Sequence, residues 1–186
     1  PDFAGDQMDQ RSWTNFMTDW LNEAYRLCRP GAPICLFIDW RQLPSMTDAL
    51  QRSGWIWRGI AVWDKATCRP QKGRFRQQAE FIVWGSKEAM PLQRNVGCLP
   101  GVFRYSNPAN GGRIHVTEKS LPLMRDIVQI CEPGGRIFDP FAGAGTTILA
   151  AVREGYEAVG IEKTAAYYKL GSDRVKFALA AGENAK

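Results

Sequence analysis

The stretch Asp139-Pro-Phe-Ala-Gly-Ala-Gly-Thr-Thr147 decides the fold. Its first residue ends a short segment, 136–139, that predicts a strand, and its last two residues begin a segment, 146–154, that predicts a helix. Glycines between a strand and a helix let the backbone approach a ligand and point the first helical amides at an acidic group. A tight structural turn needs the same residues. The stretch therefore predicts either a nucleotide-type site or a structural turn.

An acidic residue after the next predicted strand favours the binding site. Residues 156–161 predict that strand, and Glu162 ends it. An acid about 20 residues beyond a glycine-rich turn is placed to accept hydrogen bonds from both ribose hydroxyls of a nucleoside. The spacing thus predicts a nucleoside ligand.

Two residues bear on which nucleoside this is. Ile148 stands where the dinucleotide fingerprint has its third glycine, and Asp139 would repel a pyrophosphate. S-adenosylmethionine (AdoMet) carries an ammonium and a sulfonium, which suit an acid, and a carboxylate, which suits a helix start. The residues favour AdoMet and leave an NAD-like ligand and a structural turn open.

The remaining pattern alternates strands with helices. Ser12 is a candidate N-cap for a helix over 12–28, whose inward stripe includes Trp13, Phe16 and Trp20, and Ser45 is one for a short helix over 45–53. An apolar run at 34–38 predicts a strand covered on both faces. Further elements are predicted as strands at 55–63 and 79–84, an irregular excursion at 86–114, and helices at 122–131 and from 164 onward. This order predicts an α/β fold with a doubly wound, mostly parallel sheet and helices on both faces.

Composition sets the limits of the function. The chain has 186 residues, 45% of them hydrophobic, and no apolar run of the about 18 residues that would span a membrane, which predicts a single domain over 1–186. Its five scattered cysteines are typical of reduced thiols in a cytoplasmic protein, and a single histidine leaves little material for a metal site. The net charge of +5 fits a polyanionic partner without establishing one.

At this point a family resemblance adds to the residues. The glycine-rich stretch, Gly160-Ile-Glu162 and the Tyr-Tyr helix that follows resemble the AdoMet-binding motifs of bacterial and phage DNA amino-methyltransferases. His115-Val-Thr-Glu-Lys-Ser-Leu-Pro122 resembles the family's His-x-Thr-x-Lys-Pro segment, with Ser120 where proline is usual. The order of the motifs is similar to that of the permuted class usually called beta.

The resemblance implies a Rossmann-like methyltransferase fold, AdoMet as cofactor and double-stranded DNA as partner. It implies that Glu162 meets the ribose and that Thr117 and Lys119 meet the carboxylate end of AdoMet. The pocket lining that it implies is Asp139, Phe141, Gly143, Gly145 and Thr146. A homodimer is left open.

The family's catalytic motif is missing from this sequence. The family uses Asp-Pro-Pro-Tyr or variants that begin with Asn or Ser, and neither Asn107-Pro-Ala-Asn110 nor Asp139-Pro-Phe141 substitutes for it. We therefore assign no catalytic residue to this chain. In the permuted order the motif belongs before residue 1, so we expect an N-terminal segment that carries it together with strands missing here.

Basic residues provide the candidate DNA contacts. Residues 65–76 hold five cations and no acid, and they connect two predicted strands; the five are Lys65, Arg69, Lys72, Arg74 and Arg76. These could neutralise phosphates, although a solvated loop is the ordinary alternative. Arg94 and Arg104 in the irregular excursion are candidates for reading sequence in a groove, so that excursion would contribute to target recognition.

The sequence thus predicts an AdoMet-dependent DNA methyltransferase that acts on the exocyclic amino group of a flipped base. Adenine N6 is the preferred target, and cytosine N4 uses the same scaffold. A non-catalytic module that binds DNA or AdoMet is the alternative from another class. A nicotinamide oxidoreductase is disfavoured by Asp139, Ile148 and the segment around Thr117.

Overall fold

The computed structural model describes residues 8–66, 68, 70, 72–106 and 119–180. They form two compact units, one within Pro1–Trp63 and Ala79–Gln93 and the other within Asp64–Gln78 and Arg94–Lys186. No helix in these described ranges is long and apolar enough to cross a membrane.

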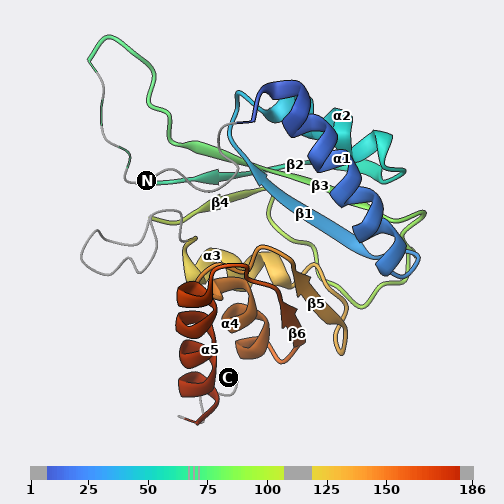
Figure 1. The fold of residues 1–186 in the computed structure, drawn as a ribbon, viewed down its shortest axis with the longest axis vertical. Helices are drawn as coiled ribbons and strands as arrows, with labels where there is room; N and C mark the ends of the chain where they lie inside the picture. Colours follow the sequence, from blue (N-terminus) through green and yellow to red (C-terminus); the bar gives the residue numbers. More distant parts are fainter. Residues whose placement is uncertain (1–7, 67, 69, 71, 107–118, 181–186) are drawn as a thin grey trace. The chain divides into compact units, whose positions relative to one another are not determined.

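The first unit is a small sheet with two helices (Figure 1). Its strand β3 lies between β1 and β2 and runs antiparallel to β1, with Leu36 opposite Val83. The helices α1 and α2 pack against each other, and α2 packs against β3. The elements are α1 (Gln10–Leu27), β1 (Pro33–Ile38), α2 (Leu43–Arg52), β2 (Ile56–Asp64) and β3 (Ala79–Ser86).

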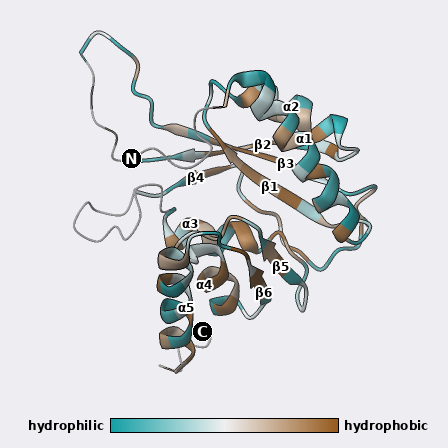
Figure 2. Ribbon diagram, viewed as in Figure 1, coloured by the Kyte–Doolittle hydropathy of each residue, from teal (hydrophilic) through white to brown (hydrophobic). Residues whose placement is uncertain are grey.

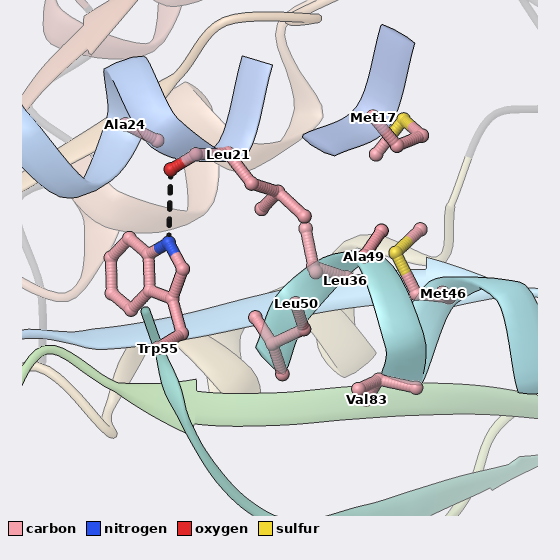
Figure 3. Packing of buried hydrophobic residues seen from close by; sticks show 9 residues of the cluster. All are labelled: Met17, Leu21, Ala24, Leu36, Met46, Ala49, Leu50, Trp55 and Val83. Atoms are coloured by element: carbon pink, nitrogen blue, oxygen red, sulfur yellow. Dashed lines mark hydrogen bonds between the residues drawn. The ribbon is translucent and has the colours of Figure 1, made fainter. Parts of the chain in front are cut away.

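The core of this unit lies between the helices and the strands. In Figure 2, β1 and β3 are mostly hydrophobic, whereas α1 and α2 carry both hydrophilic and hydrophobic residues, as expected for helices with one buried face. The buried Trp55 directs its indole towards α1, where Nε1 donates a hydrogen bond of 3.0 Å to the carbonyl oxygen of Leu21 (Figure 3). Trp13 and Trp20 pack at the edge of this cluster, which confirms their predicted core role.

A lysine fixes the end of α1. Nζ of Lys87, which follows β3, donates hydrogen bonds to the carbonyl oxygens of Tyr25 and Cys28, at 2.9 and 2.8 Å. The ammonium also lies 4.7 Å from the centre of the Tyr25 ring. The last carbonyls of a helix lack intrahelical donors and carry partial negative charge, so a cation there stabilises the helix.

The second unit contains the glycine-rich stretch. Strands β5 and β6 are parallel, with Asp139 opposite Gly160, and α4 connects them and packs against both. Helices α3 and α5 pack against α4. The elements are β4 (Val102–Arg104), α3 (Leu121–Val128), β5 (Arg136–Asp139), α4 (Thr146–Arg153), β6 (Glu157–Gly160) and α5 (Ala165–Ala180).

The α/β class is confirmed, while both predicted helix caps are wrong. The N-cap of α1 is Asp9, whose side chain accepts hydrogen bonds from the backbone N–H groups of Arg11 and Ser12. The N-cap of α2 is Gln42, and Ser45 is instead a buried residue inside the helix. Asp9 is as good a capping residue as Ser12, and Pro44 at the start of α2 favours an earlier beginning there.

The burial of two segments also differs from the prediction. Phe16 is 43% exposed, because the innermost line of α1 follows Met17, Leu21 and Ala24, a spacing of four and three residues. In β1 only Leu36 is fully buried, so this strand is less covered than its apolar run predicts.

The structure adds a short strand that the sequence did not predict. The described residues contain six strands, and the additional one, β4, lies in the excursion expected to be irregular. The backbone N–H of Tyr105, directly after β4, donates to the carbonyl oxygen of Asp64 at 3.2 Å. The Tyr105 hydroxyl donates to the carboxylate of Asp126 on α3, and this bond raises the pKa of Tyr105.

Candidate functional site

The glycine-rich turn is joined to the ends of strands β5 and β6. Oδ1 of Asp139 accepts a hydrogen bond of 3.0 Å from the backbone N–H of Phe141. The N–H of Ala142 donates to the carbonyl oxygen of Ile161, and the N–H of Ile161 donates to that of Asp139, both at 2.9 Å. These bonds hold the start of the turn against the residue that follows β6.

Two glycines shape the rest of the turn. Gly143 and Gly145 have φ angles of +53° and +76°, a region that side chains make costly. Gly145 is the N-cap of α4, and its N–H donates to the carbonyl oxygen of Ala142 at 2.7 Å. A Cβ on Gly145 would lie 3.1 Å from Cα of Gly171, so the turn and α5 approach each other backbone to backbone.

Glu162 lies beside this turn. Its Oε2 accepts a hydrogen bond of 2.9 Å from the N–H of Gly143, and its Oε1 accepts one of 2.7 Å from the N–H of Thr164. Each carboxylate oxygen has two lone pairs, so both oxygens can accept a further hydrogen bond. The structure thus brings Glu162 and the glycine-rich turn together.

The other predicted pocket residues differ in their exposure. Phe141 is 57% exposed, whereas Thr146, the first residue of α4, is buried. Lys119 is half-buried and comes shortly before α3. Thr117, like His115, lies outside the described residues.

Sequence reasoning missed two residues of α5 that contact the turn. Gly171 makes the backbone approach, and Nη1 of Arg174 donates a hydrogen bond of 2.8 Å to the carbonyl oxygen of Ala144. A glycine inside a helix costs stability relative to alanine, and this was the available signal for Gly171. Arg174 lies 30 positions from Ala144, and nothing local indicated that pairing.

The predicted basic segment is a loop of the second unit, and hydrogen bonds close its base. The N–H of Lys65 donates to the carbonyl oxygen of Gln78, and Nε2 of Gln78 donates to Oδ1 of Asp64, at 2.9 and 3.0 Å. Beyond this base the loop is exposed at Lys72, Arg74, Phe75 and Arg76, and the Phe75 side chain is 97% exposed. Arg69 lies outside the described residues.

The two arginines of the excursion, Arg94 and Arg104, differ in exposure. The Arg94 side chain is only 11% exposed; its Nε lies 3.1 Å from Oε1 of Glu132, and its Nη2 donates to the carbonyl oxygen of Ile130. The Arg94 guanidinium is therefore engaged inside the unit, and its role in reading a groove stays a prediction. Arg104 is exposed and forms a looser ion pair with Asp64 at 3.5 Å.

The end of β1 in the first unit carries another polar group. Oδ1 of Asp39 accepts hydrogen bonds from the backbone N–H and Nε of Arg41, at 2.9 and 2.8 Å, and the Trp40 ring between them is exposed. The Asp39 carboxylate holds the pKa of Arg41 above its usual value. Within the described part of the chain, no three His, Cys, Asp or Glu residues are grouped to hold a metal ion.

A comparison with protein families assigns this architecture to a class. The model of the N6_N4_Mtase family, described as DNA methylase, matches residues 2–173. The chain therefore belongs to this family of amino-methyltransferases for DNA.

Curated relatives agree with the family. The chain is 28% identical over 176 residues to the putative methylase YubD of Escherichia coli K12, an alignment that covers 92% of this chain and 72% of the relative. It is 30% identical over 168 residues to the type II methyltransferase M.XycI of Xanthomonas campestris pv. cyanopsidis, covering 80% of this chain and 54% of the relative.

Solved structures share the fold. The crystal structure of the M1.HpyAVI–SAM complex matches with a TM-score of 0.74 and 27% identity, covering 87% of this chain and 83% of that one. PvuII DNA methyltransferase, which is cytosine-N4-specific, matches with a TM-score of 0.78 and 16% identity, covering 94% of this chain and 76% of that one. The second likeness bears on the fold alone.

The close approach of the turn to α5 makes a prediction about two glycines. Gly145→Ala should destabilise the protein more than Gly155→Ala, by about 1–3 kcal/mol. Both glycines have left-handed φ angles, +76° and +79°, so both variants have a similar conformational cost. Only the Gly145 variant would also place a Cβ 3.1 Å from Gly171, whereas nothing lies within 4 Å of a Cβ on Gly155. Urea unfolding followed by circular dichroism measures the difference, and equal losses would contradict the close approach.

Proposed function

We propose that this chain binds AdoMet at the glycine-rich turn and transfers its methyl group to the exocyclic amino group of a flipped DNA base. The observation that carries the proposal is the position of the Glu162 carboxylate, 2.9 Å from the N–H of Gly143. An acid at this point can accept hydrogen bonds from ribose hydroxyls while the turn approaches the rest of the nucleoside. The family, and the SAM complex of the related M1.HpyAVI, support the same ligand.

The residues at the turn fit this ligand chemically. Asp139 supplies negative charge near the ammonium and sulfonium, and the start of α4 supplies amides and partial positive charge for the carboxylate. The exposed ring of Phe141 offers an apolar surface to an adenine base. Thr117 and Lys119 complete the proposed carboxylate end, and the proposed lining is Asp139, Phe141, Gly143, Gly145, Thr146 and Glu162.

The proposed chemistry is mainly positioning. AdoMet supplies an activated methyl group, and the base amine must lie in line with the bond from sulfur to that methyl. Holding the ligand rigidly is therefore the contribution of the turn and Glu162. The amine can lose its proton after it attacks the methyl group, so the proposal requires no general base from this chain.

The exposed basic loop is the proposed DNA contact. Lys72, Arg74 and Arg76 point charge into solvent, and Phe75 exposes nearly its whole ring among them. Cations neutralise phosphates, and an aromatic ring can stack on an unstacked base, so both features suit DNA at a flipped nucleotide. We propose Lys65 and Arg69 as further phosphate contacts and the exposed Arg104 as a contact of the target-recognition segment.

Loss of either acid should weaken AdoMet binding strongly. Asp139→Ala and Glu162→Ala should each weaken AdoMet binding at least about tenfold, because they remove the charge partner or the proposed ribose acceptor. Isothermal titration calorimetry with AdoMet and its demethylated product measures this. Glu157→Ala is the matched control, because this exposed acid pairs with Arg136 away from the turn. Unchanged affinity in the two variants would place the pocket elsewhere, and binding of NADH in place of AdoMet would favour the oxidoreductase alternative.

Neutralising the loop should change how DNA binding depends on salt. The double variant Lys72→Ala/Arg74→Ala should reduce the salt slope of DNA binding by about 1–2. With fewer phosphate contacts, fewer counterions are released from the DNA when the protein binds. Fluorescence anisotropy at several salt concentrations measures the slope. Arg11→Ala/Arg52→Ala removes the same charge from exposed sites in the first unit and should leave the slope nearly unchanged. Equal salt slopes for the two double variants would show that the loop is solvated and does not contact DNA phosphates.

The methylated base should be adenine. Incubation with duplex DNA and AdoMet, followed by digestion and mass spectrometry of the nucleosides, should yield N6-methyladenine. N4-methylcytosine would support the cytosine alternative, because both amino groups suit the same in-line geometry. Tight AdoMet binding without any methylated base would favour the non-catalytic module.

A further inference from the structure

Arg174 of α5 holds a peptide group of the glycine-rich turn. Its Nη1 donates a 2.8 Å hydrogen bond to the carbonyl oxygen of Ala144, a buried residue. The other end of the same peptide, the N–H of Gly145, donates to the carbonyl oxygen of Ala142 at 2.7 Å. Glycines with positive φ lie on both sides of Ala144, so this peptide group could adopt other orientations without these two bonds.

The Arg174 guanidinium also lies near the start of α4. The same Nη1 lies 3.5 Å from Oγ1 of Thr146, the first residue of α4. A helix begins with partial positive charge, so a cation there is unfavourable for the helix but attracts an anionic ligand group. A neutral donor would satisfy the Ala144 carbonyl without this repulsion. The arrangement therefore gains most when an anion binds at the start of α4.

Gly171 allows the guanidinium to reach the turn. A Cβ at Gly171 would lie 3.2 Å from both the carbonyl carbon of Ala144 and the backbone nitrogen of Gly145. Arg174 follows Gly171 by three residues, so both lie on the same face of α5. A side chain at 171 would push this face away from the turn.

We propose that Arg174 is a positioning residue for the cofactor: it fixes the Ala144–Gly145 peptide and adds positive potential where the carboxylate of AdoMet meets α4. This inference rests on the proposed function. It assigns α5 a role in binding the amino-acid end of the ligand, whereas Glu162 is proposed to hold the ribose. The two ends of AdoMet can therefore be tested separately.

The test compares two ligands that differ at this end. Arg174→Met should weaken AdoMet binding about tenfold, because it removes a charged hydrogen bond and a nearby cation. The same variant should weaken 5′-methylthioadenosine about threefold or less, because that nucleoside lacks the carboxylate. Arg174→Lys should recover part of the loss. Gly171→Ala should weaken AdoMet binding without removing any polar group, since its Cβ displaces the turn.

Calorimetry with both ligands and thermal unfolding of each variant measure these effects. Lys176→Met, an exposed cation on the same helix, is the matched control and should bind both ligands as the unmodified protein does. Unchanged AdoMet affinity in Arg174→Met, or equal losses for the two ligands, would overturn the inference while leaving the AdoMet site in place. Failure of the unmodified protein to bind AdoMet would reject the proposed function and this inference with it.

Discussion

The approach of Gly145 to Gly171 is the constraint on which the candidate site depends. Two backbones meet where either Cβ would lie 3.1–3.2 Å from the other chain segment, so α5 can support the turn closely only because both residues are glycine. This closeness brings Arg174 within hydrogen-bond distance of Ala144. Directly before α5, the N–H of Thr164 binds the same Glu162 carboxylate as the N–H of Gly143. The turn is thus held from the side of the helix as well as from the strands.

The two acids of the site serve both the fold and the proposed ligand. Asp139 accepts the N–H of Phe141, and Glu162 accepts two backbone N–H groups, so both carboxylates are oriented by the backbone. A carboxylate oriented in this way loses little side-chain entropy when a ligand binds. Because each oxygen keeps a lone pair, structural and ligand-binding roles are compatible. Preorganisation of this kind suits a reaction in which alignment is the main requirement.

Much of this site could be predicted from the sequence because its signals are local. The glycines, Asp139 and the spacing to Glu162 lie within one strand–helix–strand unit, and the structure brings them together. The helix caps were missed because Asp9 and Ser12 are both good caps and only the tertiary position of α1 selects between them. The strand β4 was missed because Asp64, which accepts the hydrogen bond of the N–H directly after the strand, is distant in the sequence. Arg174 was missed because its partner Ala144 is also distant in the sequence. The weak apolar pattern of α5 does not indicate which loop this helix contacts.

Arg94 and Arg74 show why cations in a basic chain cannot be assigned by type alone. Arg94 lies near the end of α3, where the Ile130 carbonyl and the Glu132 carboxylate both accept its hydrogen bonds. Burial of a guanidinium is tolerable only with such partners, so this arginine is used within the fold. Arg74 belongs to a loop whose base is closed by Lys65, Gln78 and Asp64, which leaves its tip in solvent. In this loop Phe75 is almost fully exposed and buries no apolar surface within the protein, so the ring does not stabilise the fold through the hydrophobic effect. The same charge thus stabilises the protein at one position and lies in solvent at the other.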